Sequence, residues 1–306
     1  MEKLKVVFAG TGSFGKETLE KLISDPNITI PLIITAPDKA SGRKLKVLAS
    51  AIKQTAIKNK LIVQQPERIE ELLQKLIQLQ PDILLVVAYG QLIPLEILNV
   101  PKIAAINIHA SLLPKYRGAS PIQEAILHGD RQTGITWIKM AEKLDAGDVI
   151  AQREVVLDED DTYEDLSKKL SSVAANNTNT ILAHYAHSPS KKKQDELKAS
   201  FCRKIKKEDG KIDFTHEEAI NIVRKIKAYT PWPGCYTMWN GKRLKILKAT
   251  LVEQKNDSGK VIKIEKAIII GTLNGSLHPI LVQPESKRAM SIEDFIQGQK
   301  DIPLFL

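Results

Sequence analysis

The stretch LKVVFAGTGSFG, residues 4–15, decides the fold class of this chain. Its first half is an apolar run of strand length and its second half is a glycine-rich turn, and the spacing of Leu19 and Leu22 beyond it indicates a helix. Two more apolar runs stand at residues 83–88 and 104–108, as expected for strands that are buried on both faces. Strands that alternate with helices in this way predict a doubly wound, Rossmann-like α/β sheet.

The turn GTGSFG at residues 10–15 has two interpretations. It matches the G-x-G-x-x-G pattern of dinucleotide-binding proteins, with Asp38 near the end of the second predicted strand as a candidate ribose ligand. The same glycines would serve a protein without a nucleotide, because they allow a tight turn and close packing between strand and helix. The residues alone leave both interpretations open.

Length and composition exclude several classes of protein. A chain of 306 residues predicts two domains, and no apolar run approaches the roughly 20 residues that a membrane span needs. The N-terminus lacks the pattern of a signal peptide, and the two cysteines, Cys202 and Cys235, make neither a disulfide framework nor a zinc motif. We therefore expect a cytoplasmic protein with no metal and no membrane partner.

The net charge of +9 is located entirely in the last third of the chain. Residues 1–188 carry 22 basic and 22 acidic side chains, whereas residues 189–306 carry 23 and 14. This asymmetry favours a neutral domain joined to a module that binds a polyanion. A lysine-rich surface that only aids solubility has the same composition and is the alternative.

A change in composition and periodicity after residue 188 predicts the domain boundary. The stretch that follows is polar, basic and without periodicity, as in an exposed linker. Further on, the Asn-Gly pairs at 240–241 and 274–275 each separate two short apolar runs, which predicts two hairpins with two-residue turns. The predicted parts are an α/β domain over 1–188, a basic linker over 189–206 and a small C-terminal β-barrel domain over 207–306.

The side chains most suited to catalysis follow the apolar run at 104–108. Asn107 and His109 are two residues apart and point to the same face of the predicted strand, at the carboxyl edge where open α/β sheets place their sites. An amide that can hold an oxyanion beside an imidazole that can move protons suits acyl transfer. A histidine satisfied by nearby backbone is the alternative. Asp145 is either the carboxylate partner of His109 or only a turn former.

Longer motifs add a resemblance to a known family. They are SLLPKYRGASPIQEAILHGDRQTGIT at 111–136, LDAGD at 144–148, AYG at 88–90, YTPWPGCY at 229–236 and QPESKRAMSIEDF at 283–295. With them the sequence resembles the folate-dependent formyltransferases nearly from end to end. The resemblance implies that residues 1–188 are the formyltransferase catalytic domain and that residues 207–306 are an OB-like barrel that binds tRNA. The basic loop at 36–46 and the PWPG motif are typical of the branch of the family that formylates methionyl-tRNA.

The resemblance implies that 10-formyltetrahydrofolate, with no metal, donates its formyl group to the α-amino group of methionine on initiator tRNA. By position, Asn107, His109 and Asp145 match the catalytic residues of the family, which hold the formyl oxygen, handle protons and orient the imidazole. The resemblance also implies that the glycine turn binds no dinucleotide, and that Gly12 and Gly15 are packing glycines. The implied folate-binding residues are Ala88, Tyr89, Gly90, Ser111, Leu112, Leu113 and Pro114.

Two basic groups are the implied contacts with tRNA. In the family, the loop that matches residues 38–46 enters the acceptor stem, and Arg43 matches its key arginine. Lysines of the linker and the second domain would contact phosphate, which gives affinity with little sequence choice. A solvated basic surface is the alternative for both groups. The implied tRNA-binding residues are Lys39, Arg43, Lys44, Lys46, Lys206 and Lys207, and we expect a monomer.

Two other functions compete with this one. A formyltransferase of the same family could act on a small amine, such as a nucleotide-linked amino sugar, but the charged loop and the basic second domain count against it. A non-catalytic RNA-binding protein could use the same basic barrel. Such a protein would have no need of Asn107 and His109 at a strand end together with Asp145.

Overall fold

The structure is a computed structural model that describes residues 3–41, 46–299 and 301–305. The chain groups into two compact units, each of which is discontinuous in sequence. The predicted division at residues 188 and 206 stays a prediction. The first unit contains Met1–Gly118, Gln132–Val156 and Ser167–Cys202, and the second contains Ala119–Arg131, Leu157–Leu166 and Arg203–Leu306.

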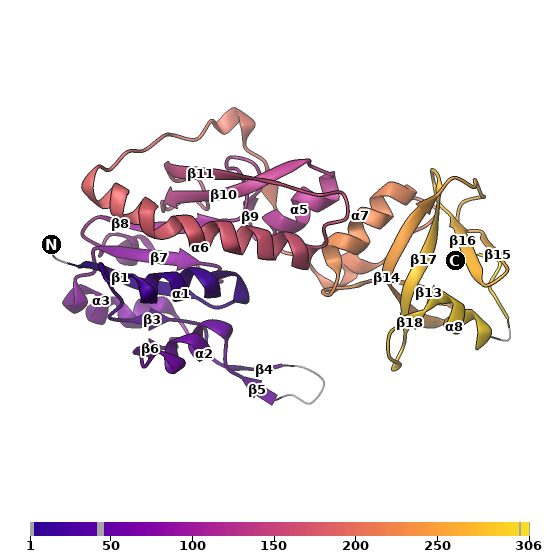
Figure 1. Cartoon of the computed structure of the whole chain (residues 1–306), viewed down its shortest axis with the longest axis horizontal. Coiled ribbons are helices and arrows are strands. Elements are labelled where there is room, and N and C mark those ends of the chain that lie inside the picture. The colour runs from indigo at the N-terminus through magenta and orange to yellow at the C-terminus, as the bar shows by residue number, and fades with distance from the viewer. Residues whose placement is uncertain (1–2, 42–45, 300, 306) are drawn as a thin grey trace. The chain divides into compact units, whose positions relative to one another are not determined.

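A mixed β-sheet forms the centre of the first unit (Figure 1). Its order is β11-β10-β8-β7-β1-β3-β6, with β2 paired to β1. The strands from β8 to β6 are parallel, as the alternation of strands and helices predicts, whereas β10 is antiparallel to both of its neighbours. The strands are β1 (Leu4–Gly10), β2 (Ile28–Thr29), β3 (Ile33–Ile34), β6 (Val63–Gln64), β7 (Ile83–Val87), β8 (Ala104–His109), β10 (Gln132–Lys139) and β11 (Val149–Val156).

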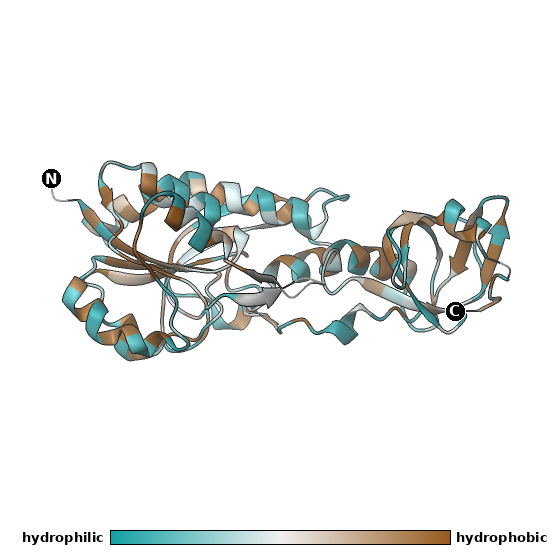
Figure 2. Cartoon of the chain, turned by 90° about the horizontal axis from the view of Figure 1, so that it is seen from below, coloured by the Kyte–Doolittle hydropathy of each residue, from teal (hydrophilic) through white to brown (hydrophobic). Residues whose placement is uncertain are grey.

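Helices cover both faces of this sheet (Figure 2). On one face, Val7 and Ala9 of β1 share a buried core with Leu76 of α3. On the opposite face, Trp137 of β10 is fully buried, and its indole N–H donates to Thr178 of α6 at 3.1 Å. The helices are α1 (Lys16–Ser24), α2 (Ala51–Lys58), α3 (Leu73–Leu79), α4 (Leu95–Leu98) and α6 (Tyr163–His187), with 3-10 turns η1 (Ser13–Gly15), η2 (Ile69–Leu72) and η3 (Glu196–Lys198).

The glycine turn after β1 packs closely at two of its three glycines. A Cβ at Gly10 would lie 2.8 Å from the carbonyl oxygen of Val87, and one at Gly15 would lie 3.1 Å from the Val87 side chain. Gly12 has an ordinary φ of −71° and open space where a Cβ would be. The expectation of packing glycines is therefore confirmed at Gly15 and wrong at Gly12, because no neighbouring group approaches that side of Gly12.

The second unit is built on an antiparallel sheet in the order β13-β14-β17-β16-β15, with β18 beside β17. The first predicted hairpin turn is confirmed, because Asn240 and Gly241 both have positive φ. The two-residue turn expected at the second Asn-Gly pair is wrong. Gly271 pairs with Ser276, which leaves a four-residue loop in which Gly275 supplies the positive φ.

Helices accompany this sheet within the second unit. After α5, the backbone at Gly129 lies against the guanidinium of Arg224 on α7, where an added Cβ would collide. An α/β unit followed by a small antiparallel β unit confirms the predicted fold class. The elements are α5 (Pro121–His128), η4 (Lys207–Gly210), α7 (Ala219–Tyr229), β13 (Cys235–Trp239), β14 (Lys242–Val252), β15 (Val261–Ile264), β16 (Ala267–Gly271), β17 (Ser276–Pro284), β18 (Met290–Ser291) and α8 (Ile292–Gln297).

The segment expected to begin an exposed linker takes part in the fold of the first unit. Lys192 and Val149 exchange two backbone hydrogen bonds, of 2.8 and 2.9 Å. Further along, β12 (Phe201–Cys202) pairs in parallel with β9 (Arg117–Gly118). Both ends of residues 192–202 are therefore held by backbone pairing, which their polar and aperiodic sequence did not indicate.

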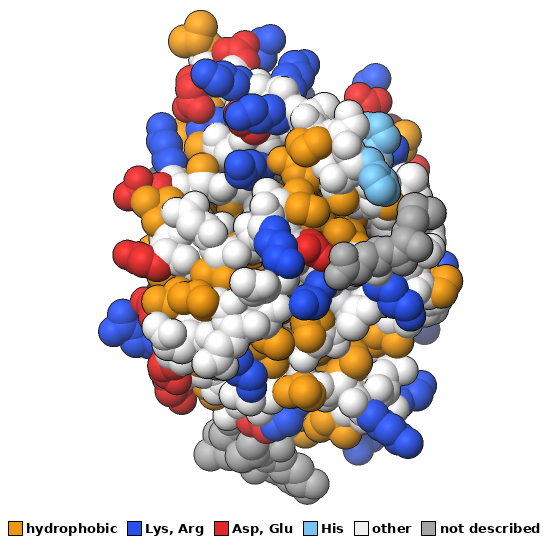
Figure 3. All heavy atoms as spheres, turned by 90° about the vertical axis from the view of Figure 1, so that its left-hand side faces the viewer, with side chains coloured by type: hydrophobic (Ala, Val, Ile, Leu, Met, Phe, Trp, Pro, Cys, Tyr) orange, Lys and Arg blue, Asp and Glu red, His pale blue; other side chains and the backbone are white. Residues whose placement is uncertain are grey.

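The surface of the first unit has no single sign of charge on the face shown in Figure 3. Basic and acidic side chains are intermixed there among apolar ones, in agreement with the balanced charge of residues 1–188. Within the described ranges, no helix combines the length and the apolar character that crossing a membrane requires.

Both cysteines are buried free thiols. Burial raises the pKa of the Cys235 thiol to about 12. Because the thiolate is the nucleophilic form, Cys235 stays protonated and unreactive at neutral pH.

Candidate active site

The carboxyl end of β8 carries two polar side chains on one face of the sheet. Asn107 and His109 share this face with Ala105, which belongs to the buried core. In the antiparallel pairing with β10 they lie opposite Ile138 and Thr136. His109 is only 5% exposed and Asn107 is half-buried, so this polar pair is enclosed by the fold.

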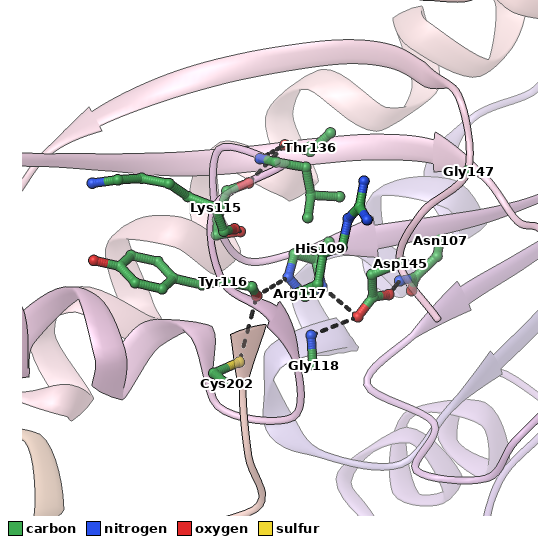
Figure 4. Close-up of polar contacts among 12 residues, drawn as sticks. Asn107, His109, Lys115, Tyr116, Arg117, Gly118, Thr136, Asp145, Gly147 and Cys202 are labelled. Atoms are coloured by element: carbon green, nitrogen blue, oxygen red, sulfur yellow. Dashed lines mark hydrogen bonds and ion pairs between the residues drawn. The ribbon is translucent and has the colours of Figure 1, made fainter. Parts of the chain in front are cut away.

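The carboxylate of Asp145 meets both side chains (Figure 4). Its Oδ1 accepts a hydrogen bond from Asn107 Nδ2 at 3.3 Å, while its Oδ2 accepts one from the Gly118 backbone N–H at 2.9 Å and lies 3.6 Å from His109 Nδ1. Asp145 has a φ of 50° and stands in the loop between β10 and β11. We call Asn107, His109 and Asp145 the Asp145 cluster.

The other ring nitrogen of His109 is bonded to the backbone. Its Nε2 lies 2.9 Å from the carbonyl oxygen of Tyr116, and since a carbonyl oxygen can only accept, Nε2 carries the proton. In the neutral ring Nδ1 is then the basic nitrogen, and it faces Asp145. A proton taken up at Nδ1 is therefore held beside a carboxylate.

The loop after β8, residues 111–114, is fastened to the two neighbouring strands. The Thr136 hydroxyl of β10 donates to the carbonyl of Ser111 at 2.6 Å and accepts from the N–H of Leu113 at 3.1 Å. From β11, the Gln152 amide donates to the carbonyl of Leu113 at 2.9 Å and to the Thr136 hydroxyl at 3.0 Å. These bonds give the loop a fixed shape.

The AYG turn stands beside this loop, at the end of β7. Because Val86 of β7 is in register with Asn107 of β8, the two strands end side by side. Thr11 holds the turn by donating to the carbonyl of Tyr89 at 2.9 Å. The Tyr89 ring is turned into the core, and its burial raises the pKa of the phenol to about 12. Of the implied folate-binding residues, Ala88 and Gly90 are exposed, Leu112 and Pro114 are half-buried, and Tyr89, Ser111 and Leu113 are buried.

Sequence reasoning missed three polar residues next to the cluster. The guanidinium of Arg117 is 1% exposed and donates to both carboxylate oxygens of Glu196, at 2.8 and 2.9 Å. It also donates from Nε and Nη2 to the side-chain oxygen of Gln194, at 3.0 and 2.9 Å. The hydrogen bonds from Arg117 lower the pKa of the Glu196 carboxyl. Arg117 was visible as part of SLLPKYRG, whereas the other two stood in an aperiodic stretch that carried no signal.

The basic residues implied as tRNA contacts lie apart from the Asp145 cluster in sequence. Lys39 and Lys46 belong to an antiparallel pair, β4 (Lys39–Ser41) and β5 (Lys46–Leu48), while Arg43 and Lys44 lie outside the described residues. Lys206 and Lys207 are exposed in the second unit. Across the residues that the structure does describe, no group of three or more His, Cys, Asp or Glu side chains could hold a metal ion.

Comparison with known proteins decides the family. A family model described as formyl transferase matches residues 3–182, and one described as formyl transferase, C-terminal domain, matches residues 204–300. The chain belongs to the formyl transferase family. The resemblance carried by the sequence motifs is therefore confirmed, and with it the expectation of an enzyme that transfers a formyl group.

A curated relative and two solved structures are each similar to more than nine-tenths of this chain. A methionyl-tRNA formyltransferase from Sulfurimonas denitrificans is 40% identical over 300 residues, 97% of this chain and 97% of the relative. The N-formyltransferase of Helicobacter canadensis, in complex with folinic acid and dTDP-3-aminofucose, has a TM-score of 0.67 at 21% identity over 93% of this chain and 100% of its own. HypX from Aquifex aeolicus, in complex with tetrahydrofolic acid, has a TM-score of 0.63 at 17% identity over 97% and 47%. At these identities the two structures show the shared fold.

Gly147 tests how tightly the loop around Asp145 is packed. A Cβ at this buried glycine would overlap the carbonyl oxygen of Lys139. We expect Gly147→Ala to lower the free energy of unfolding by about 1–3 kcal/mol, as overpacking does. The matched change Gly12→Ala, which meets open space, should stay within about 0.5 kcal/mol of the parent. Urea denaturation followed by circular dichroism measures both, and equal stability of the two variants would show that the loop yields to a methyl group.

Proposed function

We propose that this chain transfers the formyl group of 10-formyltetrahydrofolate to the α-amino group of methionine on initiator tRNA, which supplies formylmethionyl-tRNA for translation initiation. The observation that carries the proposal is the enclosed Asp145 cluster at the carboxyl edge of the sheet, in a chain similar over 97% of its length to a methionyl-tRNA formyltransferase. An amide, an imidazole and a carboxylate in contact suit formyl transfer to an amine, and binding alone would not call for them.

The amide of Asn107 would stabilise the charge that develops on the formyl oxygen. Attack by the amine turns the formyl carbonyl into a tetrahedral species with negative charge on oxygen, and a fixed N–H donor lowers the energy of that species. Asn107 Nδ2 has two hydrogens and gives one to Asp145. The second hydrogen is the one proposed to face the substrate, and the bond to Asp145 fixes which way the amide points.

His109 would move the proton that the amine loses. Its Nε2–H is held by the Tyr116 carbonyl, so Nδ1 accepts the proton from the attacking nitrogen and later returns it to the folate nitrogen that leaves. While Nδ1 carries this proton, the imidazolium lies 3.6 Å from the Asp145 carboxylate. The carboxylate would thereby stabilise the charged ring during the step.

The folate co-substrate would bind along the ends of β7 and β8. Backbone at Ala88 and Gly90 is exposed in positive-φ turns, and a Cβ at Gly90 would meet open space. The half-buried side chains of Leu112 and Pro114 add apolar surface. Such a site fits a planar, partly apolar ring system bound through backbone groups, while the inward-facing Ser111, Leu113 and Tyr89 would hold its walls in place.

Transfer RNA would bind through phosphate contacts to the two basic groups. The first group is the basic stretch with Lys39, Arg43, Lys44 and Lys46, and the second is the exposed pair Lys206 and Lys207. The excess positive charge of residues 189–306 supports a polyanionic substrate. We further propose that the protein works as a monomer in the cytoplasm, where its charged tRNA substrate is made.

An acceptor comparison tests the proposal. The purified protein is given 10-formyltetrahydrofolate with methionine-charged initiator tRNA, charged elongator tRNA or a small amino sugar nucleotide, and the release of tetrahydrofolate is followed. We expect turnover with the charged initiator tRNA. Turnover with the small amine alone would replace tRNA by the competing substrate class, and no turnover with any acceptor would reject the enzymatic function.

Replacement of His109 tests the proton-transfer role. We expect His109→Ala to lower kcat by about 100-fold or more, because general acid–base catalysis contributes on this scale, while the Kd for tRNA stays within twofold. The exposed His184 on α6 supplies the matched control, His184→Ala. Steady-state kinetics and filter binding measure the two quantities, and parental turnover by His109→Ala would contradict the role.

Replacement of Arg43 tests the basic loop. We expect Arg43→Ala to lower kcat/KM for charged initiator tRNA by about 10-fold, on the scale of one lost charge-assisted contact, and to leave the Kd for the folate unchanged. Tetrahydrofolate release at several tRNA concentrations measures the effect. Kinetics identical to those of the parent protein would remove this arginine from tRNA recognition.

A further inference from the structure

Residues 192–202 contact both the loop that carries Asp145 and the loop after β8. At one end, Lys192 exchanges backbone hydrogen bonds with Val149, just after the Asp145 loop. At the other end, the carbonyl of Ser200 accepts from the N–H of Arg117 at 2.8 Å, in the loop after β8. We call residues 192–202 the strap.

Gln194 of the strap bonds directly to the backbone around Asp145. Its Nε2 donates to the carbonyl oxygen of Asp145 at 2.8 Å and to that of Gly147 at 2.7 Å. A side-chain amide has two N–H donors, so both are used on this one loop. The two bonds span Ala146 and fix the path of the loop.

The orientation of the Gln194 amide is set by Arg117. A guanidinium has donors only, so the side-chain oxygen of Gln194 must face Arg117, from which it accepts at 2.9 and 3.0 Å. Arg117 in turn is buried and held by Glu196. The NH2 group of Gln194 is thereby directed at the Asp145 loop.

The Asp145 loop needs such support. Asp145 has a φ of 50°, a left-handed conformation that costs free energy for a residue with a side chain. The four residues before it, Ala141–Leu144 in the chain, are exposed, so packing against the core does not hold them. The Asp145 carboxylate must nevertheless stay 3.3 Å from Asn107 Nδ2 and 3.6 Å from His109 Nδ1, and small displacements of groups in a reacting centre lower the rate strongly.

We propose that Gln194 is a positioning residue of the enzyme, which holds the backbone of residues 145–147 so that the Asp145 carboxylate stays on Asn107 and His109. This inference rests on the proposed function, because the position of Asp145 matters for rate only if the cluster is the catalytic centre. Gln194 acts through the loop, and substrate binding is assigned to other residues.

The change Gln194→Glu keeps an oxygen for Arg117 but replaces the two donors by a carboxylate oxygen, which repels the carbonyl oxygens of Asp145 and Gly147. We expect kcat to fall about 10- to 100-fold, with KM for the folate and for charged tRNA within twofold, because the substrate-binding residues are not touched. Gln194→Ala should likewise lower kcat and leave both KM values within twofold of the parent. The matched control is Leu197→Ala, whose side chain on the same strap is 98% exposed and whose kcat should equal that of the parent.

Hydrogen–deuterium exchange provides a readout that does not depend on turnover. Peptides covering residues 142–149 should exchange faster in both Gln194 variants than in the parent, and at the parental rate in Leu197→Ala. In an Asp145→Asn background, Gln194→Ala should lower the remaining kcat by less than threefold, since residues that act as one unit are not additive.

The outcomes separate this inference from the proposed function. An active parent with unchanged kcat in both Gln194 variants, or unchanged exchange at residues 142–149, would overturn the positioning role alone. If Gln194→Ala lowered kcat as much in the Asp145→Asn background as in the parent, the positioning role would also be overturned, because Gln194 would then act independently of Asp145. A parent that is inactive with every acceptor would reject the proposed function, while faster exchange in the variants would still establish the hold of Gln194 on the loop.

Discussion

One carboxylate organises the site. Asp145 accepts hydrogen bonds from a side-chain amide on β8 and from a backbone N–H in the loop after it, and it faces an imidazole whose other nitrogen is already bound to a carbonyl. The Asn107 amide and the Gly118 N–H are fixed as donors by these contacts, and the bond to the Tyr116 carbonyl fixes the orientation of the imidazole. The apolar strands therefore enclose a polar cluster whose side chains have defined orientations, and enclosure strengthens each electrostatic contact.

A second constraint comes from the burial of a guanidinium. Removing Arg117 from water costs free energy unless its donors are satisfied, and the acceptors that satisfy them belong to Gln194 and Glu196. The loop after β8 thus depends on a segment almost eighty residues further along the chain. The same contacts stabilise the fold and hold the Asp145 cluster in place, so a change that frees the later segment would disturb both.

Local patterns in the sequence were sufficient for the parts of the fold that depend on neighbours in sequence. Alternation along β8 placed Asn107 and His109 on one face, and the pair Asn240-Gly241 predicted its hairpin, because period and turn geometry are properties of a few adjacent residues. The prediction of a two-residue turn at the second Asn-Gly pair was wrong, because β16 and β17 pair in a register that leaves four residues between them. The residues alone left Asp145 either as a partner of His109 or as a turn former, and only the family resemblance favoured the first, because what distinguishes the two is a contact with Asn107, 38 positions away. No sequence pattern distinguished Gln194 from the other polar residues of the predicted linker.

The two compact units are interleaved along the chain, which passes between them five times. Residues 119–131 and 157–166 belong to the unit that also holds everything after residue 202, and Lys227 of α7 bonds to the carbonyl of Glu159 at 2.8 Å. No single cut in the polypeptide can therefore divide the protein into its units. A protease that cleaves in the exposed stretch before the strap would leave two fragments still joined through α5 and α7, and the nicked protein would migrate as one species until it is denatured.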